Sequence, residues 1–150
     1  MRRHVDDSFE RLIVAEYTKP LPIPDDDSRA FWNACKEHKL VAQRCCACGT
    51  LRFPPRGVCP ICYSWDAEWQ RLADTGTIRT FVVPHRSFSE GFKNEVPYVI
   101  AHVAIDGTDD RVVIVGNVVG VPWTEVRVGM PVKVFFEDAT DTISLPKFRA

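Results

Sequence analysis

The chain is poor in the features that mark several large protein classes. Its 150 residues include only eight glycines and two methionines, and its charges nearly balance at a formal net −1. It has no glycine-rich nucleotide-binding motif and no G-x-S-x-G nucleophile motif. No apolar run is long enough for a membrane helix or for the core of a signal peptide. We therefore expect a cytoplasmic protein with no membrane association.

Side chains that could act as a catalytic base are also few. The chain has four histidines, and only His85 and His102 lie where a base could be useful. Alternation in the strand expected at 98–105 puts His102 on the same face as Ile100, which indicates a core or interface histidine rather than a base. We therefore do not expect the chain to be an enzyme on its own.

What the sequence does have is a cysteine quartet. Cys45 and Cys48 form one C-x-x-C pair, and Cys59 and Cys62 form a second pair ten residues further on. This spacing is typical of a zinc ribbon, because each short gap lets two sulfurs reach one metal ion. Disulfides are disfavoured for a cytoplasmic chain. The sequence predicts one zinc ion per chain.

The chemistry of the quartet predicts a structural role for this zinc. Four thiolates fill the tetrahedral coordination of zinc and leave no position for water or substrate. Cys46 is adjacent to a ligand and should point elsewhere, and Cys35 should pack as a small apolar residue on a helix. The metal is therefore expected to hold the fold and to do no chemistry.

The N-terminal third of the chain combines helical and extended patterns. Apolar spacing in residues 1–17 suits a short amphipathic helix, whose role the sequence does not define. The alternating prolines of 19–24 favour an extended arm lying on a surface. Asp25 to Ser28 offer helix caps, and the spacing of Phe31, Trp32 and Cys35 predicts a helix at 28–38.

The remainder of the chain follows a β pattern. A short strand with Trp69 as a packing residue is expected at 65–72, and five more strands are expected at 77–84, 98–105, 112–119, 132–136 and 143–148. Five strands without an intervening helix predict a small barrel. The expected fold is mainly β: one or two N-terminal helices in a segment at 1–38, a zinc ribbon at 39–70, and a five-stranded barrel domain at 71–150.

Several segments resemble the DUF35 family, in which a rubredoxin-like zinc ribbon precedes an OB-fold domain. They are Phe31-Trp32, Leu40–Cys45, Phe53–Arg56, Cys59–Cys62, Pro97–Ala101, Gly129–Val134 and Pro146–Arg149. The likeness runs in order over residues 19–149. It implies a non-catalytic accessory subunit of a thiolase-like complex acting on acyl-CoA thioesters, with the catalytic residues on the partner. A subunit of an acyl-CoA hydratase or aldolase complex is the alternative within this class.

A nucleic-acid-binding module is the alternative from another class, because zinc ribbons and OB-folds often bind nucleic acid. Residues 36–62 carry five basic side chains and one acidic side chain. Four thiolates on zinc remove about two of these positive charges, however, and the expected barrel is net negative. We therefore expect a protein partner and no nucleic acid.

Two segments are candidates for contact with coenzyme A or with the partner. Arg52 and Arg56 lie between the two cysteine pairs, where they could meet phosphates or acidic side chains, and Phe53 either joins them or packs against the first helix. Phe88 and Phe92 lie in the loop at 86–96. Exposing aromatic rings to water is unfavourable, so we expect these two to be covered by the protein or by a partner.

Overall fold

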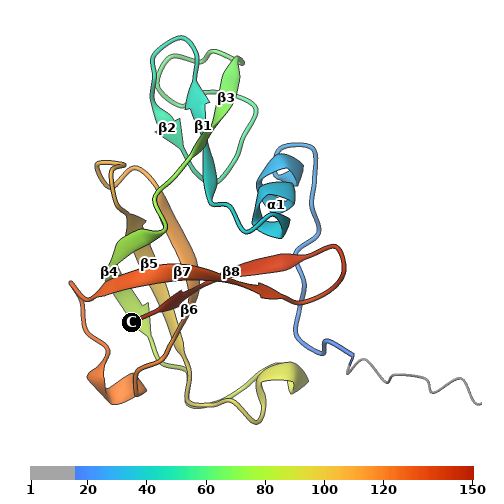
Figure 1. Cartoon of the computed structure of the whole chain (residues 1–150), viewed down its shortest axis with the longest axis vertical. Coiled ribbons are helices and arrows are strands. Elements are labelled where there is room, and N and C mark those ends of the chain that lie inside the picture. The colour runs from blue at the N-terminus through green and yellow to red at the C-terminus, as the bar shows by residue number, and fades with distance from the viewer. Residues whose placement is uncertain (1–15) are drawn as a thin grey trace, which may run out of the picture.

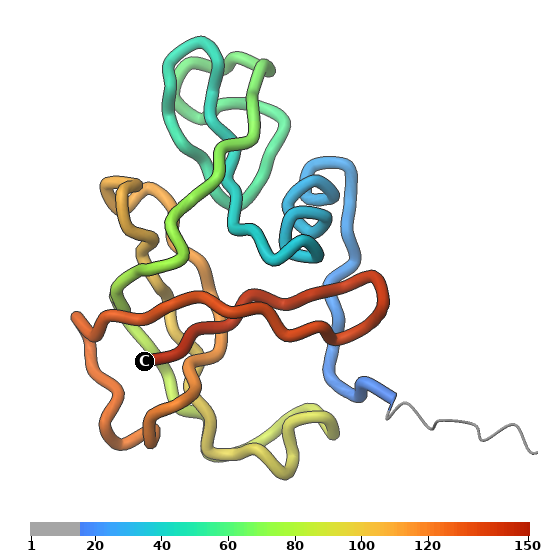
Figure 2. Tube along the Cα trace, viewed as in Figure 1, coloured from blue at the N-terminus to red at the C-terminus, as the bar shows by residue number. Residues whose placement is uncertain are grey.

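The computed structural model describes residues 16–150, as a small three-stranded sheet standing above a barrel (Figures 1 and 2). One short helix, α1 (Arg29–Lys36), lies beside both. The helix expected at 1–17 lies almost entirely outside the described residues. Residues 16–150 contain no helix with the length and apolarity needed to cross a membrane.

The N-terminal arm has no regular secondary structure between Lys19 and Pro24, as the prolines predict. It is attached to the barrel at its start, where the Tyr17 hydroxyl donates to Glu137 at 3.3 Å and Lys19 forms an ion pair with Glu95. Ile23 is 91% exposed, so much of the arm's apolar surface stays uncovered.

Helix α1 begins after a turn in which the Ser28 amide donates to the Asp25 carboxylate at 2.8 Å. Its inner face buries Phe31 and Cys35 in the main core. Burial raises the pKa of the Cys35 thiol to about 12. Cys35 is therefore a neutral packing residue, as the helical spacing predicts.

The upper sheet has the antiparallel order β2-β1-β3, formed by β1 (Val41–Cys45), β2 (Leu51–Arg52) and β3 (Ala67–Arg71). Cys45 ends β1, so this sheet carries the first metal-binding turn. Trp69, expected as a packing residue, is partly covered, with 37% of its surface exposed. Its strand, β3, lies at the edge of the sheet.

The barrel closes in the order β4-β5-β6-β8-β7, with β7 returning to β4. This is the expected five-stranded OB-like barrel, and β6 and β8 are its only parallel pair among the described strands. Its core consists mainly of β-branched side chains together with Phe148. The strands are β4 (Thr75–Val82), β5 (Val99–Ile105), β6 (Val113–Val119), β7 (Pro131–Asp138) and β8 (Ser144–Arg149).

The inward face of β5 differs from the one that the sequence predicted. Val99, Ala101 and Val103 are buried, whereas His102 is exposed. The core alternative for His102 is therefore wrong, whereas the interface alternative stays a prediction. Both faces of this strand carry aliphatic residues, since Ile100 lies on the outer side, and alternation alone did not distinguish them.

Candidate metal centre and the junction with the barrel

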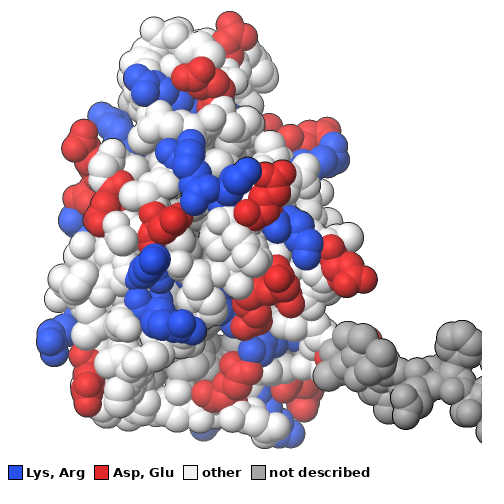
Figure 3. Space-filling model, viewed as in Figure 1, with Lys and Arg blue, Asp and Glu red and all other residues white. Residues whose placement is uncertain are grey.

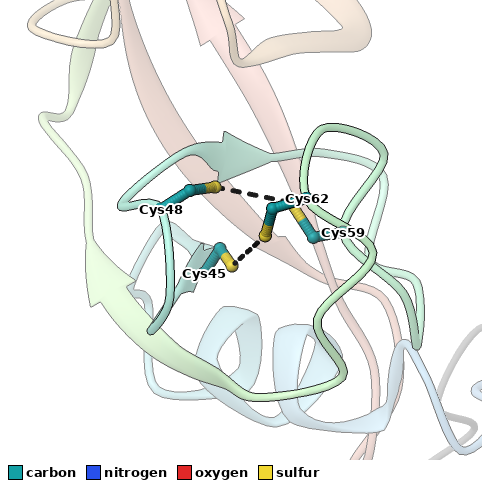
Figure 4. Close-up of side chains that lie close together, drawn as sticks. All are labelled: Cys45, Cys48, Cys59 and Cys62. Atoms are coloured by element: carbon teal, nitrogen blue, oxygen red, sulfur yellow. Dashed lines mark hydrogen bonds between the residues drawn. The ribbon is translucent and has the colours of Figure 1, made fainter.

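The four cysteine sulfurs converge at the upper end of the three-stranded sheet (Figure 4). All four lie within 4.8 Å of one another, with Cys45 to Cys62 at 3.5 Å and Cys48 to Cys59 at 3.7 Å. Sulfurs at the corners of a tetrahedron with zinc–sulfur bonds of about 2.3 Å lie about 3.8 Å apart. The quartet therefore fits a single zinc ion.

Two similar turns bring the sulfurs together. In the first, the Gly49 amide donates to the carbonyl of Cys45 at 2.9 Å, and in the second the Tyr63 amide donates to the carbonyl of Cys59 at 3.0 Å. Gly49 and Tyr63 occupy equivalent positions, four residues after the first cysteine of each pair, and both have a positive φ, at 72° and 60°. Glycine adopts this conformation easily, whereas Tyr63 adopts it with strain.

Hydrogen bonds favour the thiolate form at two of the ligands. Contacts from the Thr50 hydroxyl and amide lower the pKa of Cys48 to about 6, and the amides of Cys62 and Ile61 lower the pKa of Cys59. Zinc binds thiolates, so these donors prepare the site for the metal. Bound zinc would leave no open coordination position, which gives it a structural role.

Cys46 is exposed and lies outside the cluster. Its amide donates to the carbonyl of Asp66 at 3.0 Å, which ties the first turn to the chain leading into β3. The prediction that it points away from the metal is confirmed.

Arg52 does not project into solvent, and the expectation that it is exposed is wrong. It is 3% exposed, and its Nε donates to the Gln43 side-chain carbonyl at 2.9 Å. The same oxygen accepts the Arg56 amide at 2.9 Å, so one buried glutamine holds both ends of the segment. The spacing of the cysteines gave no signal for this role of Gln43.

Phe53 and Arg56 differ in their surroundings. The Phe53 ring packs edge-on against Phe31 of α1, with 5.2 Å between ring centroids. This agrees with the structural alternative for Phe53, in which it joins the ribbon to the helix. The Arg56 side chain is exposed.

The two phenylalanines of the loop between β4 and β5 also differ in how far the chain covers them. Phe92 stacks on Tyr98 at 4.8 Å between centroids, and the Lys19 ammonium lies 5.0 Å from its centroid, so the chain itself covers this ring. Phe88 is 97% exposed. Phe92 thus has the expected cover from the protein itself, whereas Phe88 has none from the described residues.

The two histidines considered as bases lie in different surroundings. His85 packs edge-on against Trp123, with centroids 4.9 Å apart, and His102 lies on the outer face of β5.

A ribbon with a four-cysteine centre followed by a five-stranded OB barrel defines the class of the protein. Family models agree with this class in both parts. Residues 32–66 match the ChsH2 rubredoxin-like zinc ribbon domain, and residues 69–137 match the ChsH2 C-terminal OB-fold domain.

The chain is also similar to individual proteins. It is 32% identical over 118 residues to a DUF35 domain-containing scaffold protein of Methanocaldococcus jannaschii, covering 75% of this chain and 81% of that one. It is 37% identical over 132 residues to a probable enoyl-CoA hydratase alpha subunit of Thermomonospora curvata, covering 87% of this chain. It spans only 40% of the length of that relative.

A solved structure gives the same result. The chain superimposes on a chain of an Ltp2–ChsH2(DUF35) aldolase with a TM-score of 0.77 and 35% sequence identity, covering 86% of this chain and 98% of that chain. The protein belongs to the DUF35 family, with the zinc ribbon and OB-fold domains of the ChsH2 type, and its cofactor is one structural zinc ion.

Proposed function

We propose that the protein is a non-catalytic, zinc-binding accessory subunit of a hetero-oligomeric, thiolase-like complex that acts on acyl-CoA thioesters. The similarity to the Ltp2–ChsH2(DUF35) aldolase chain is the observation that carries the accessory role, because it extends over 98% of that chain. The thiolase-like partner is proposed from the family resemblance. The chain supplies a metal-stabilised scaffold, and its partner supplies the catalytic groups.

The surface of the described residues favours a protein partner over a nucleic acid. Basic and acidic side chains alternate over the face in Figure 3, without a continuous basic groove. Strands corresponding to β5 and β6 form the usual binding face of OB-folds. Here their outer side carries Ile100 and Val115, the latter 53% exposed, which suits protein contact better than a phosphate backbone.

We propose Phe88 as the main partner contact of the loop between β4 and β5. A phenylalanine that is 97% exposed gains by burial at an interface, whereas Phe92 is already covered and would act by holding the loop. Arg56 is the exposed arginine of the ribbon available to coenzyme A phosphates or partner carboxylates, and Arg52 and Phe53 would support it from inside the fold. We also propose the division into segments at 1–38, 39–70 and 71–150.

A hydratase or aldolase complex is the second candidate. The similarity to a probable enoyl-CoA hydratase alpha subunit supports it, although the chain spans less than half of that relative. Both candidates place the chain beside an enzyme that uses acyl-CoA, and they differ in the partner.

Identification of the protein that co-purifies with the chain at its natural level tests the proposal. We expect an acyl-CoA enzyme whose turnover requires this chain, and the identity of that enzyme separates a thiolase-like partner from a hydratase or aldolase. A polymerase or a ribosomal protein as the stable partner would refute the proposal. Phe88→Ser should reduce co-elution, and Val128→Ser, at another exposed apolar residue, is the matched control.

A further inference from the structure

A hollow of about 320 Å³ lies between the zinc ribbon and the hairpin that joins β5 to β6. The ribbon contributes Arg52 and Arg56, together with Pro60 and Ile61 of the second metal-binding turn, and the hairpin contributes Asp110 and Arg111. Three guanidinium groups from two separate parts of the fold therefore surround one space. Sequence spacing does not bring Arg111 near the other two, so this cluster exists only in the folded chain.

The buried member of the cluster has an unused donor. Arg52 is 3% exposed, and its Nη1 has no hydrogen-bond partner. Its Nε donates to the Gln43 side-chain carbonyl at 2.9 Å, which fixes the orientation of the guanidinium. Burying a charge is costly unless it is compensated. Because Nη1 is shielded from solvent, Arg52 contributes its positive charge to the wall of the hollow rather than a donor that a ligand reaches.

The charges around the hollow are not neutralised by the described part of the chain. Asp110 is its one acidic wall residue, and Asp110 already pairs with Arg79 at 2.7 Å. Within residues 16–150, Arg52, Arg56 and Arg111 form no ion pair with a carboxylate. The hollow therefore keeps three positive groups that no carboxylate of the described residues neutralises.

The hairpin presents Arg111 from a fixed backbone. The buried Thr108 hydroxyl donates to the Ile105 carbonyl at 2.7 Å, and the Arg111 amide donates to the Thr108 carbonyl at 2.9 Å. Asp109 and Asp110 both adopt positive φ, at 49° and 58°, which closes the turn. These bonds reduce the entropy lost when Arg111 engages a ligand.

We propose that this hollow is a binding site for the phosphate groups of a small-molecule ligand, with Arg56 and Arg111 as the accessible clamps and Arg52 as a buried positive charge beside them. Arginine presents paired N–H groups that match phosphate oxygens. A single carboxylate would leave two of the three positive charges uncompensated, whereas a diphosphate balances them better. A volume of about 320 Å³ is ample for such a group.

The zinc centre affects how strongly the hollow attracts an anion from a distance. Zinc with four thiolates carries about −2 and lies behind the turn that forms one wall, so it weakens the long-range attraction of an anion. Recognition of the anion should then depend on directed hydrogen bonds from the arginine N–H groups, which act at short range. In the proposed function, this hollow would hold the phosphate groups of the acyl-CoA ligand. Only this biological source of the phosphate rests on the proposed function.

Titration of the full, zinc-loaded chain with inorganic pyrophosphate at low ionic strength tests the site without any partner. We expect saturable binding, a loss of about tenfold or more in affinity for Arg111→Gln, and a similar loss for Arg56→Gln. Acetate should bind at least about tenfold more weakly than pyrophosphate. Because pyrophosphate itself complexes zinc, zinc content is measured after each titration to confirm that the ribbon stays loaded.

Two further variants make the test specific. Arg127→Gln removes an exposed arginine on the loop before β7 and should leave binding unchanged. Asp110→Asn removes the acidic wall residue and should bind pyrophosphate at least as tightly as the wild type. No saturable binding, equal binding of acetate, or equal losses in Arg111→Gln and Arg127→Gln would each overturn the site. These results do not depend on partner co-elution, so the failure of the site and the failure of the proposed function can be told apart.

Discussion

The zinc ribbon and the barrel reach a defined structure by different means. The ribbon buries few large apolar side chains, and Tyr63 and Trp65 on its second turn are each 75% exposed. The barrel instead encloses a continuous core of aliphatic side chains around Phe148. Metal coordination and a few polar contacts should therefore hold the ribbon, whereas hydrophobic burial should hold the barrel.

The largest expected effect is the loss of a zinc ligand. Cys59→Ser should lose the metal and the ordered ribbon together, because structural zinc contributes about 10–16 kcal/mol to the folding of small zinc domains. Metal analysis of the purified variant measures the loss. Hydrogen exchange should show fast exchange in β1 to β3 while β5 and β6 stay protected.

Cys46→Ser is the matched control, because Cys46 is exposed and outside the quartet. It should keep both zinc and ribbon protection. Equal zinc loss in the two variants would contradict the assigned ligands. Full loss of protection in the barrel on metal removal would contradict the separation of the two regions.

The core of the barrel provides the next largest effect. Phe148 is 1% exposed, and its ring is so close to Gly116 that a Cβ there would lie 2.9 Å from Phe148 Cε2. Phe148→Ala should lower the free energy of unfolding by about 3–5 kcal/mol, because it leaves a cavity in a close-packed core. Denaturant unfolding of the zinc-loaded protein measures this change. A loss below about 1 kcal/mol would mean that the barrel does not depend on this core.

Acid should affect the two regions through different groups. Burial raises the pKa of Glu137, but the hydrogen bond and charge of Lys147 outweigh it, so the pKa lies below its ordinary 4.5. Glu137 therefore stabilises the fold above pH about 4.5, and this contribution is lost as the pH falls through the lowered pKa. The effect should be under about 1 kcal/mol for a partly exposed pair.

Glu137→Gln should flatten the pH dependence of unfolding below pH 4.5 and leave zinc content unchanged at each pH. Zinc release on acidification should follow the thiolates instead. If the variant lost zinc at a higher pH than the wild type, the two regions would be coupled through β7.

The sequence predicted the ribbon and the barrel because each follows a strong local rule. The spacing of the quartet fixes two turns, and five apolar runs separated by turn residues indicate five strands. The prediction failed where both faces of a segment look alike, as in β5, where Ile100 on the outer face obscured the exposure of His102.

The junction between the two regions was beyond sequence reasoning. Arg52 appears in the sequence as a charged residue in a loop, which usually means exposure. Its burial depends on Gln43 in β1, nine residues earlier, and the hollow beside it depends on Arg111 from the barrel. The Arg52–Gln43 contact is a cross-strand pair within the ribbon. The approach of Arg111 follows instead from how the ribbon and the barrel pack together, which no local pattern specifies.

The smallest expected effect on stability comes from Phe88. Because its ring is 97% exposed, Phe88→Ser should change the free energy of unfolding by less than about 0.5 kcal/mol. Phe92→Ser should cost more, since it removes a ring stacked on Tyr98 and covered by Lys19. If the partner binds this loop, Phe88→Ser should weaken association as strongly as Phe92→Ser while leaving folding intact. Paired unfolding and co-elution measurements on the two single variants check this, and a destabilised Phe88→Ser chain would show that the barrel relies on this loop more than its exposure indicates.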